Sequence, residues 1–177
     1  MIFANDRQVG VEIGPGRGDF LLASAVAQPL WNFFAIEHSH SRTREIEARL
    51  AHGAAGNARV VCADASCLLP LIPDASVAAV FTQFPDPWWK RRHHKRRLWT
   101  TDFVANLRRV LAPAASIELL TDVEQTFRLA QKYLDAEPGL AAVEVGCLAR
   151  HDTWFARKAL RRGGAIYRSL HRKTAGC

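Results

Sequence analysis

A short apolar run followed at once by closely spaced glycines most constrains the fold of this chain. Residues 9–13 read Val-Gly-Val-Glu-Ile, residues 14–18 read Gly-Pro-Gly-Arg-Gly, and residues 19–28 have the composition of a helix. A strand that passes through a glycine turn into a helix is the opening unit of α/β sheets that bind nucleotides. Because tight turns also use glycine for steric reasons, the motif alone is weak evidence for a ligand.

The same alternation of strands and helices continues along the chain. Further strands are predicted at 33–37, 59–63, 77–83, 116–120, 140–145 and 166–170, and further helices at 41–52, 101–111 and 123–136. This order favours an α/β fold, with a mostly parallel sheet, an antiparallel edge, helices on both faces and a ligand crevice at the carboxyl ends of the strands. With 177 residues and 49% apolar content, we expect one domain over residues 1–177.

Charge is distributed unevenly, and this limits the class of partner. The net charge is +7, although residues 90–97 alone contain six Lys or Arg and residues 150–177 contain eight. Two basic stretches on a mildly acidic body favour a polyanionic partner. The sequence has no apolar run of 18 residues and no signal-peptide pattern, so we expect no membrane partner. The four cysteines lack CxxC spacing, which predicts reduced thiols in the cytoplasm and no metal site.

Carboxylates stand at or near the predicted ends of the first three strands. Glu37 falls 19 residues after Gly18, where a carboxylate can accept two ribose hydroxyls, and the glycine spacing is GxGxG, not the GxGxxG of dinucleotide enzymes. Glu12 is a charge in an apolar strand and needs a partner such as an amino group. Asp64 could contact the adenine amino group. Each acid alone could be a helix cap or a surface charge, but together they favour S-adenosylmethionine over NAD, whose pyrophosphate prefers an electropositive turn. The cofactor is expected to lie against Gly14, Gly16 and Gly18.

Residues 84–97 read Phe-Pro-Asp-Pro-Trp-Trp-Lys-Arg-Arg-His-His-Lys-Arg-Arg. Two prolines fix the backbone on either side of Asp86 and hold its carboxylate in place. Trp88 and Trp89 offer flat faces for stacking and the basic residues attract phosphate, which together suggest chemistry on a nucleic acid. A solvated charge run beside a turn would explain the basic residues but neither the prolines nor the tryptophans. The nucleic-acid backbone is expected to lie on Arg91, Arg92, Lys95, Arg96 and Arg97.

These motifs resemble those of the bacterial tRNA (guanine-N7)-methyltransferase family, a family with the Rossmann-like class I methyltransferase fold. The resemblance rests on Val11-Glu12-Ile13-Gly14-x-Gly16-x-Gly18-x-Phe20-Leu21, Ile36-Glu37, Asp64-Ala65, Phe84-Pro85-Asp86-Pro87-Trp88 with its basic run, and Thr121-Asp122. It implies methyl transfer from S-adenosylmethionine to N7 of a guanine in the variable loop of tRNA, by a monomer or a homodimer.

The resemblance also implies roles for single residues. Glu12, Glu37 and Asp64 would contact the cofactor, and Asp86 would be catalytic or would orient the guanine. Substrate contacts are implied for Lys90, Asp122, Thr153 and Arg157.

The chain departs from the family pattern at three places. Ala156 stands where the family has a glutamate, and the N-terminal segment before the first strand is shorter than is usual. The alternative function is therefore a relative that binds tRNA or S-adenosylmethionine without efficient transfer. Pro113-Ala114-Ala115 replaces the usual Pro-Gly-Gly, a change that a turn tolerates at modest cost if it requires no positive φ.

Overall fold

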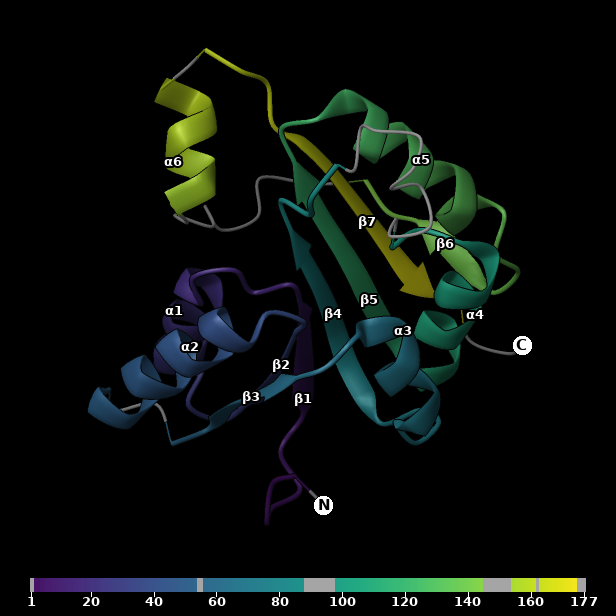
Figure 1. The fold of residues 1–177 in the computed structure, drawn as a ribbon. Helices are drawn as coiled ribbons and strands as arrows, with labels where there is room; N and C mark the ends of the chain where they lie inside the picture. The colour runs from purple at the N-terminus through teal and green to yellow at the C-terminus, as the bar shows by residue number, and fades with distance from the viewer. Residues whose placement is uncertain (1, 54–55, 88–97, 145–153, 162, 175–177) are drawn as a thin grey trace.

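The computed structural model describes residues 2–53, 56–87, 98–144, 154–161 and 163–174. Strands and helices alternate along most of this part of the chain (Figure 1). The strands are β1 (Val9–Ile13), β2 (Asn32–Glu37), β3 (Ala58–Cys62), β4 (Val77–Gln83), β5 (Leu111–Thr121), β6 (Leu140–Ala142) and β7 (Tyr167–Lys173). The helices are α1 (Asp19–Ala27), α2 (His40–His52), α3 (Ala65–Leu68), the 3-10 helix η1 (Leu69–Leu71), α4 (Thr101–Val110), α5 (Glu124–Asp135) and α6 (Trp154–Arg161).

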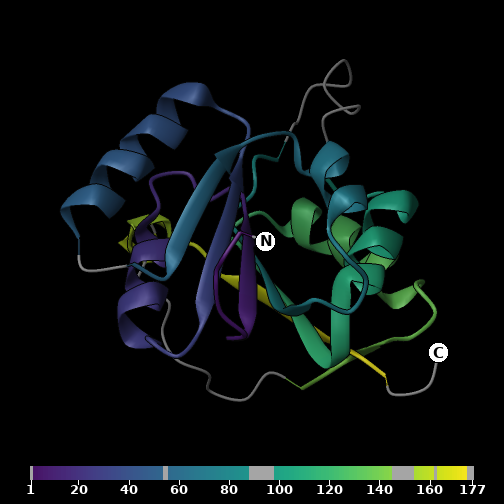
Figure 2. The ribbon, with the colours of Figure 1, turned by 90° about the horizontal axis from the view of Figure 1, so that it is seen from below.

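Seven strands form a single sheet in the order β3-β2-β1-β4-β5-β7-β6. The first five strands run parallel to one another, while β7 pairs antiparallel with both β5 and β6. Figure 2 shows α1 and α2 on one face of the sheet and α3, α4 and α5 on the other. The predicted mostly parallel sheet with an antiparallel edge is therefore confirmed. Among the described helices, none is long and apolar enough to cross a membrane.

Apolar side chains fill the space between the sheet and the helices on each face. Leu21 of α1 and Ile46 of α2 pack with Phe33 in one cluster, and Leu107 of α4 and Leu134 of α5 belong to a larger cluster on the other face. A parallel sheet covered on both faces buries the whole strand, which explains why the predicted strands read as continuous apolar runs. Because these strands are parallel, the carboxyl ends of β1, β2, β4 and β5 lie along the same edge of the sheet, at the ends of the strands and not beside the antiparallel strand β7.

The boundary between α4 and β5 differs from the sequence prediction. The helix ends at Val110 and β5 begins at Leu111, five residues before the predicted start at Ser116. Ala114 has a φ of 61°, and the pairing with β4 shifts register around this point. The turn therefore does require a positive φ at Ala114, so the condition for replacing Pro-Gly-Gly at modest cost is not met. The left-handed conformation costs an alanine roughly 1–2 kcal/mol. The pattern also misses α3 and η1, because elements of four and three residues show no periodicity.

Candidate functional site

The turn after β1 is built on left-handed glycines. Gly14, Gly16 and Gly18 have φ values of 68°, 58° and 76°, a region that only glycine enters without strain. A Cβ on Gly18 would also lie 3.0 Å from Ile46 Cγ1, whereas a Cβ on Gly14 would meet nothing within 4 Å. The glycines are thus required by the path of the backbone, and the turn leaves open space beside Gly14.

Glu37, at the end of β2, holds this turn in place. Its side chain is 4% exposed. The N–H of Gly16 donates to Oε2 at 3.3 Å, and the N–H of Ser39 donates to Oε1 at 2.9 Å. Both carboxylate oxygens therefore accept hydrogen bonds from the main chain. Since each oxygen has two lone pairs, the carboxylate retains capacity for hydroxyl donors.

Glu12 is the most buried carboxylate of the site, and its residue is 1% exposed. Its Oε2 has no hydrogen-bond partner among the described residues. Burial, reinforced by the negative charges of Asp19 and Glu37, raises the pKa of Glu12 to about 8, although a backbone hydrogen bond from Leu21 works in the opposite direction. The strand therefore carries a carboxyl group that would gain strongly from a nearby cation.

We expect the raised pKa of Glu12 to make the protein less stable as pH rises. The unfolded chain releases this proton near pH 4.5 and the folded protein near pH 8, so the stabilisation is complete below pH 4.5 and is lost as pH rises through 8. The cost is about 1.4 kcal/mol per pH unit within this window. Glu12→Gln should remove this slope and be the more stable form at pH 7.5. Urea unfolding of both proteins from pH 5 to 8 measures the difference, and a difference independent of pH would refute the assignment.

Asp64 follows β3 and is exposed. It is the N-cap of α3: the N–H and the hydroxyl of Ser66 donate to its Oδ1 at 2.8 and 2.6 Å. The side-chain hydrogen bond from Ser66 is the main reason why the pKa of Asp64 lies below its ordinary value. The structure thus gives Asp64 a capping role, which leaves its predicted contact with adenine as a proposal. Within the described part of the chain, no group of three His, Cys, Asp or Glu side chains could hold a metal ion.

The chain leaves β4 through an unusual turn. Phe84 has a φ of 51°, which is rare for a bulky residue, and its N–H donates to the carbonyl of Leu120 at 2.7 Å. Asp86 follows in this turn and is exposed. Asp122 is also exposed and comes directly after the neighbouring strand β5. Both predicted substrate carboxylates therefore follow adjacent strands at the same edge of the sheet as the glycine turn.

Three further polar residues near this edge were missed by the sequence reasoning. Gln83, Glu118 and Arg168 are contributed by β4, β5 and β7, and Glu118 lies between the other two. Glu118 carries the same sequence signal as Glu12, a charge within an apolar strand. Its partner Arg168 could not be found in this way, because the two residues are 50 positions apart and meet only through the antiparallel register of β5 and β7.

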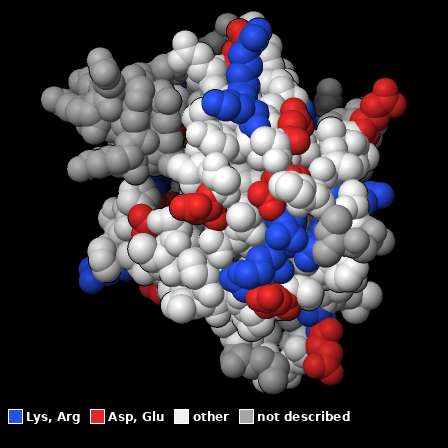
Figure 3. Space-filling view, turned by 90° about the vertical axis from the view of Figure 1, so that its right-hand side faces the viewer, with Lys and Arg blue, Asp and Glu red and all other residues white. Residues whose placement is uncertain are grey.

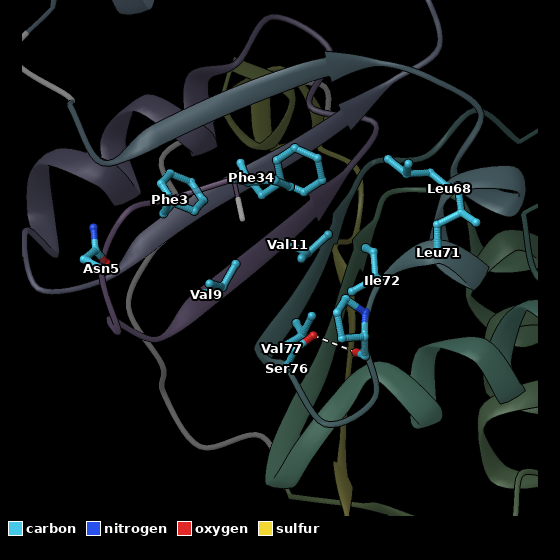
Figure 4. Close-up of a pocket in the computed structure, with 12 residues that line it drawn as sticks. Phe3, Asn5, Val9, Val11, Phe34, Leu68, Leu71, Ile72, Ser76 and Val77 are labelled. Carbon is cyan, nitrogen blue, oxygen red and sulfur yellow. Dashed lines mark hydrogen bonds between the residues drawn. The ribbon is translucent and has the colours of Figure 1, made fainter.

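A separate hollow lies near the amino ends of β1 and β4 (Figure 4). Its volume is about 380 Å³, and its walls are mostly apolar. The Ser76 hydroxyl at its rim donates to the carbonyl of Pro73, and the Asn5 side chain accepts from Asn32. None of the predicted site residues lines this cavity. The carboxylates that would bind a charged ligand lie at the other end of the strands. The apolar wall of the hollow is formed by Phe3, Val9, Val11, Phe34, Leu68, Ile72 and Val77.

Known proteins are similar in sequence to this chain across nearly its whole length. Residues 6–168 match the family described as "Putative methyltransferase". The tRNA (guanine-N(7)-)-methyltransferase of Acidithiobacillus ferrooxidans is 36% identical over 175 residues, which cover 96% of this chain and 77% of that protein. The enzyme of the same name from Rhodopirellula baltica is 32% identical over 185 residues, which cover 97% of this chain and 68% of that protein. The chain belongs to the tRNA (guanine-N(7)-)-methyltransferase family. The family resemblance inferred from the motifs is confirmed.

Solved methyltransferases share the fold of this family member. The 16S rRNA methyltransferase KamB gives a TM-score of 0.68 at 16% identity, covering 94% of this chain and 88% of its own. A mutant 16S rRNA methyltransferase from Catenulisporales acidiphilia, solved with the cosubstrate SAM, gives a TM-score of 0.65 at 17% identity, covering 94% of this chain and 86% of its own. At such low identity the likeness establishes the fold alone, and it confirms the predicted class I methyltransferase architecture.

Several residues that the family resemblance singled out lie on α6 or outside the described residues. On α6, Arg157 is exposed and Ala156, which replaces the family glutamate, is 6% exposed. The predicted role of Arg157 in substrate binding stays a proposal. Outside the described residues lie Lys90, Arg91, Arg92, Lys95, Arg96, Arg97 and Thr153.

Proposed function

We propose that the protein transfers a methyl group from S-adenosylmethionine to N7 of a guanine in tRNA. The observation that carries this function is the agreement, over 96% of the chain, with a curated tRNA (guanine-N(7)-)-methyltransferase at 36% identity. The geometry supports it, because the glycine turn, Glu12, Glu37 and Asp86 all lie at the edge of the sheet where α/β proteins bind their ligands. Such a substrate places the protein in the cytoplasm.

The residues beside the glycine turn suit S-adenosylmethionine. The unpartnered, buried Oε2 of Glu12 is matched by the ammonium group of the methionine moiety. Glu37 retains lone pairs for the ribose hydroxyls, and the open space at Gly14 permits close approach to the backbone. Asp64, at the end of the next strand, is the candidate for the adenine amino group.

The reaction depends more on the placement of its two substrates than on proton transfer. S-adenosylmethionine supplies a methyl group already activated on a sulfonium. Guanine N7 has a free lone pair and no proton, so no residue of the chain needs to act as a general base. Holding the reacting atoms in line can supply about 7 to 11 kcal/mol. Asp86 and Asp122 are the candidates to accept hydrogen bonds from guanine N1 and N2, which would favour the developing positive charge and exclude adenine.

Two sets of basic residues would hold the tRNA. Figure 3 shows basic and acidic side chains interspersed on the side of the molecule formed by α4 and α5. Arg108 pairs with Glu137 at 2.6 Å, and Arg128 pairs with Glu124 at 2.6 Å. Paired charges of this kind give little attraction to phosphate. The polyanion-binding surface is assigned to residues 90–97, where six Lys or Arg fall in eight positions beside Trp88 and Trp89, and to Arg157, Lys158, Arg161 and Arg162.

Replacing Glu37 by Ala should weaken binding of S-adenosylmethionine at least tenfold. The variant loses the ribose acceptor and also the acceptor that holds the Gly16 N–H. Calorimetric titration measures the affinity, and Glu45→Ala, which removes an exposed carboxylate of the adjoining helix, is the matched control. An unchanged affinity in Glu37→Ala would mean that the cofactor does not lie at this turn.

The proposed activity is tested by incubating the protein with unmodified bulk tRNA and radiolabelled S-adenosylmethionine, followed by nucleoside analysis. Label in 7-methylguanosine is expected. Label in any other nucleoside would overturn the assigned position of methylation. Cofactor binding without transfer to any tRNA would instead identify a protein that binds without catalysis.

A further inference from the structure

Three polar side chains from neighbouring strands are buried together beneath the turn that carries Asp86. Gln83 is 7% exposed and Glu118 is 5% exposed, and the side chain of Arg168 is 18% exposed. Strand register places them together: Gln83 and Arg168 both pair with Leu120, which is two residues beyond Glu118 on β5. Their side chains therefore emerge on one face of the sheet.

Glu118 connects the other two side chains. Arg168 donates from its terminal Nη2 to Glu118 Oε2 at 2.7 Å, and Gln83 Nε2 lies 3.5 Å from Glu118 Oε1. Burial of an ion pair is costly, because the loss of hydration can exceed the attraction between the charges. Gln83 Oε1 and Arg168 Nε are also buried without hydrogen-bond partners among the described residues. This arrangement contributes less to stability than apolar packing of the same volume could.

The network is attached directly to the start of the Asp86 turn. Gln83 is the last residue of β4, and the next residue, Phe84, takes the left-handed conformation with a φ of 51°. Pro85 and Pro87 then restrict the backbone on both sides of Asp86. Because the turn itself is stiff, the direction of Asp86 depends on how firmly Gln83 and Phe84 are anchored to the sheet.

We propose that Glu118 is a positioning residue for methyl transfer: held by Arg168, it fixes Gln83 at the end of β4 and thereby sets the position of Asp86. This inference rests on the proposed function, since the position of Asp86 is read out through the rate of guanine methylation. Placement errors of about 1 Å are sufficient to reduce rates by roughly a hundredfold in enzymes that depend on positioning.

The test is a double-mutant cycle between Glu118→Gln and Asp86→Asn. Glu118→Gln alone should lower kcat for tRNA methylation about tenfold and leave the affinity for S-adenosylmethionine unchanged. In the Asp86→Asn background the same substitution should cost less than twofold, because Glu118 acts through the residue already removed. Gln83→Met, which keeps the length of the side chain and removes its amide, should show the same dependence and serves as the second variant if Glu118→Gln does not fold.

The control is Glu137→Gln, which neutralises a carboxylate in another partly buried ion pair, with Arg108 at 2.6 Å. It should lower stability without changing kcat. Equal losses from Glu118→Gln in both backgrounds, or a loss that merely follows the folded fraction, would show that the network is structural and overturn the inference while leaving the function intact. A wild-type protein that methylates no tRNA would overturn both.

Discussion

Replacing Asp86 by Asn should lower methyl transfer to tRNA by about two orders of magnitude, while the fold and the affinity for S-adenosylmethionine stay unchanged. The carboxylate is exposed at the end of β4, so its replacement by an amide of the same size disturbs no packing. Under the proposed function it removes one preorganised negative charge that would face the guanine as the ring becomes cationic, and losses of 10²- to 10³-fold are typical when one such contact is removed.

Formation of 7-methylguanosine on unmodified tRNA under single-turnover conditions measures this effect on the chemical step. Asp102→Asn is the matched control, because Asp102 is an exposed aspartate in the first turn of α4, where it takes no part in the proposed site. The control should retain wild-type activity. A loss of less than threefold in Asp86→Asn would remove Asp86 from the catalytic role.

Neutralising four arginines of the basic run should weaken tRNA binding by roughly a thousandfold near 0.1 M salt. Each phosphate contact contributes a slope of roughly 0.7 to 0.9 to the plot of log affinity against log salt, so the loss of four contacts should flatten the plot by about 3. Filter binding between 50 and 300 mM salt gives both quantities. The residues to be replaced by Gln are Arg91, Arg92, Arg96 and Arg97.

A control with the same change in net charge separates specific contacts from general attraction. Four exposed arginines elsewhere are replaced by Gln for this purpose: Arg42, Arg44, Arg128 and Arg172. This control should change the slope by less than 1. If the two variants gave equal slopes of log affinity against log salt, residues 90–97 would contribute only to the general positive charge of the protein and would not make specific phosphate contacts.

The strands and most helices were predictable because each carries a local signal. Continuous apolar runs marked the buried parallel strands, and the polar residues that follow them marked the edge where the site lies. The same reasoning placed Glu37 at a strand end beside the glycine turn, where the structure shows it accepting a hydrogen bond from Gly16. For Asp64 it left open a helix cap, a surface charge or a cofactor contact, because a helix of four residues shows no periodicity in the sequence, and the structure makes Asp64 the N-cap of α3.

Features that depend on strand register were beyond the sequence. The meeting of Glu118 with Arg168 requires β7 to run antiparallel to β5, and nothing in either segment specifies this partner. The left-handed φ of Phe84 is similarly invisible, since bulky residues rarely adopt it and the surrounding structure must impose it. Phe84 lies in the turn that leads to Asp86, and Glu118 contacts Gln83 at the start of that turn, so the least predictable features are those that would orient the substrate.

The position of β7 in the sheet has a consequence for synthesis of the protein. β7 lies between β5 and β6, although both of these strands precede it in the chain. During translation, residues 116–121 of β5 must wait with one row of backbone hydrogen-bonding groups unpaired until their partners in β7, residues 167–172, have left the ribosome. Long unpaired edges of this kind invite association with other chains. Translation that stops before residue 167 would therefore yield a chain with an open sheet and a tendency to aggregate, so formation of the complete sheet depends on synthesis of β7.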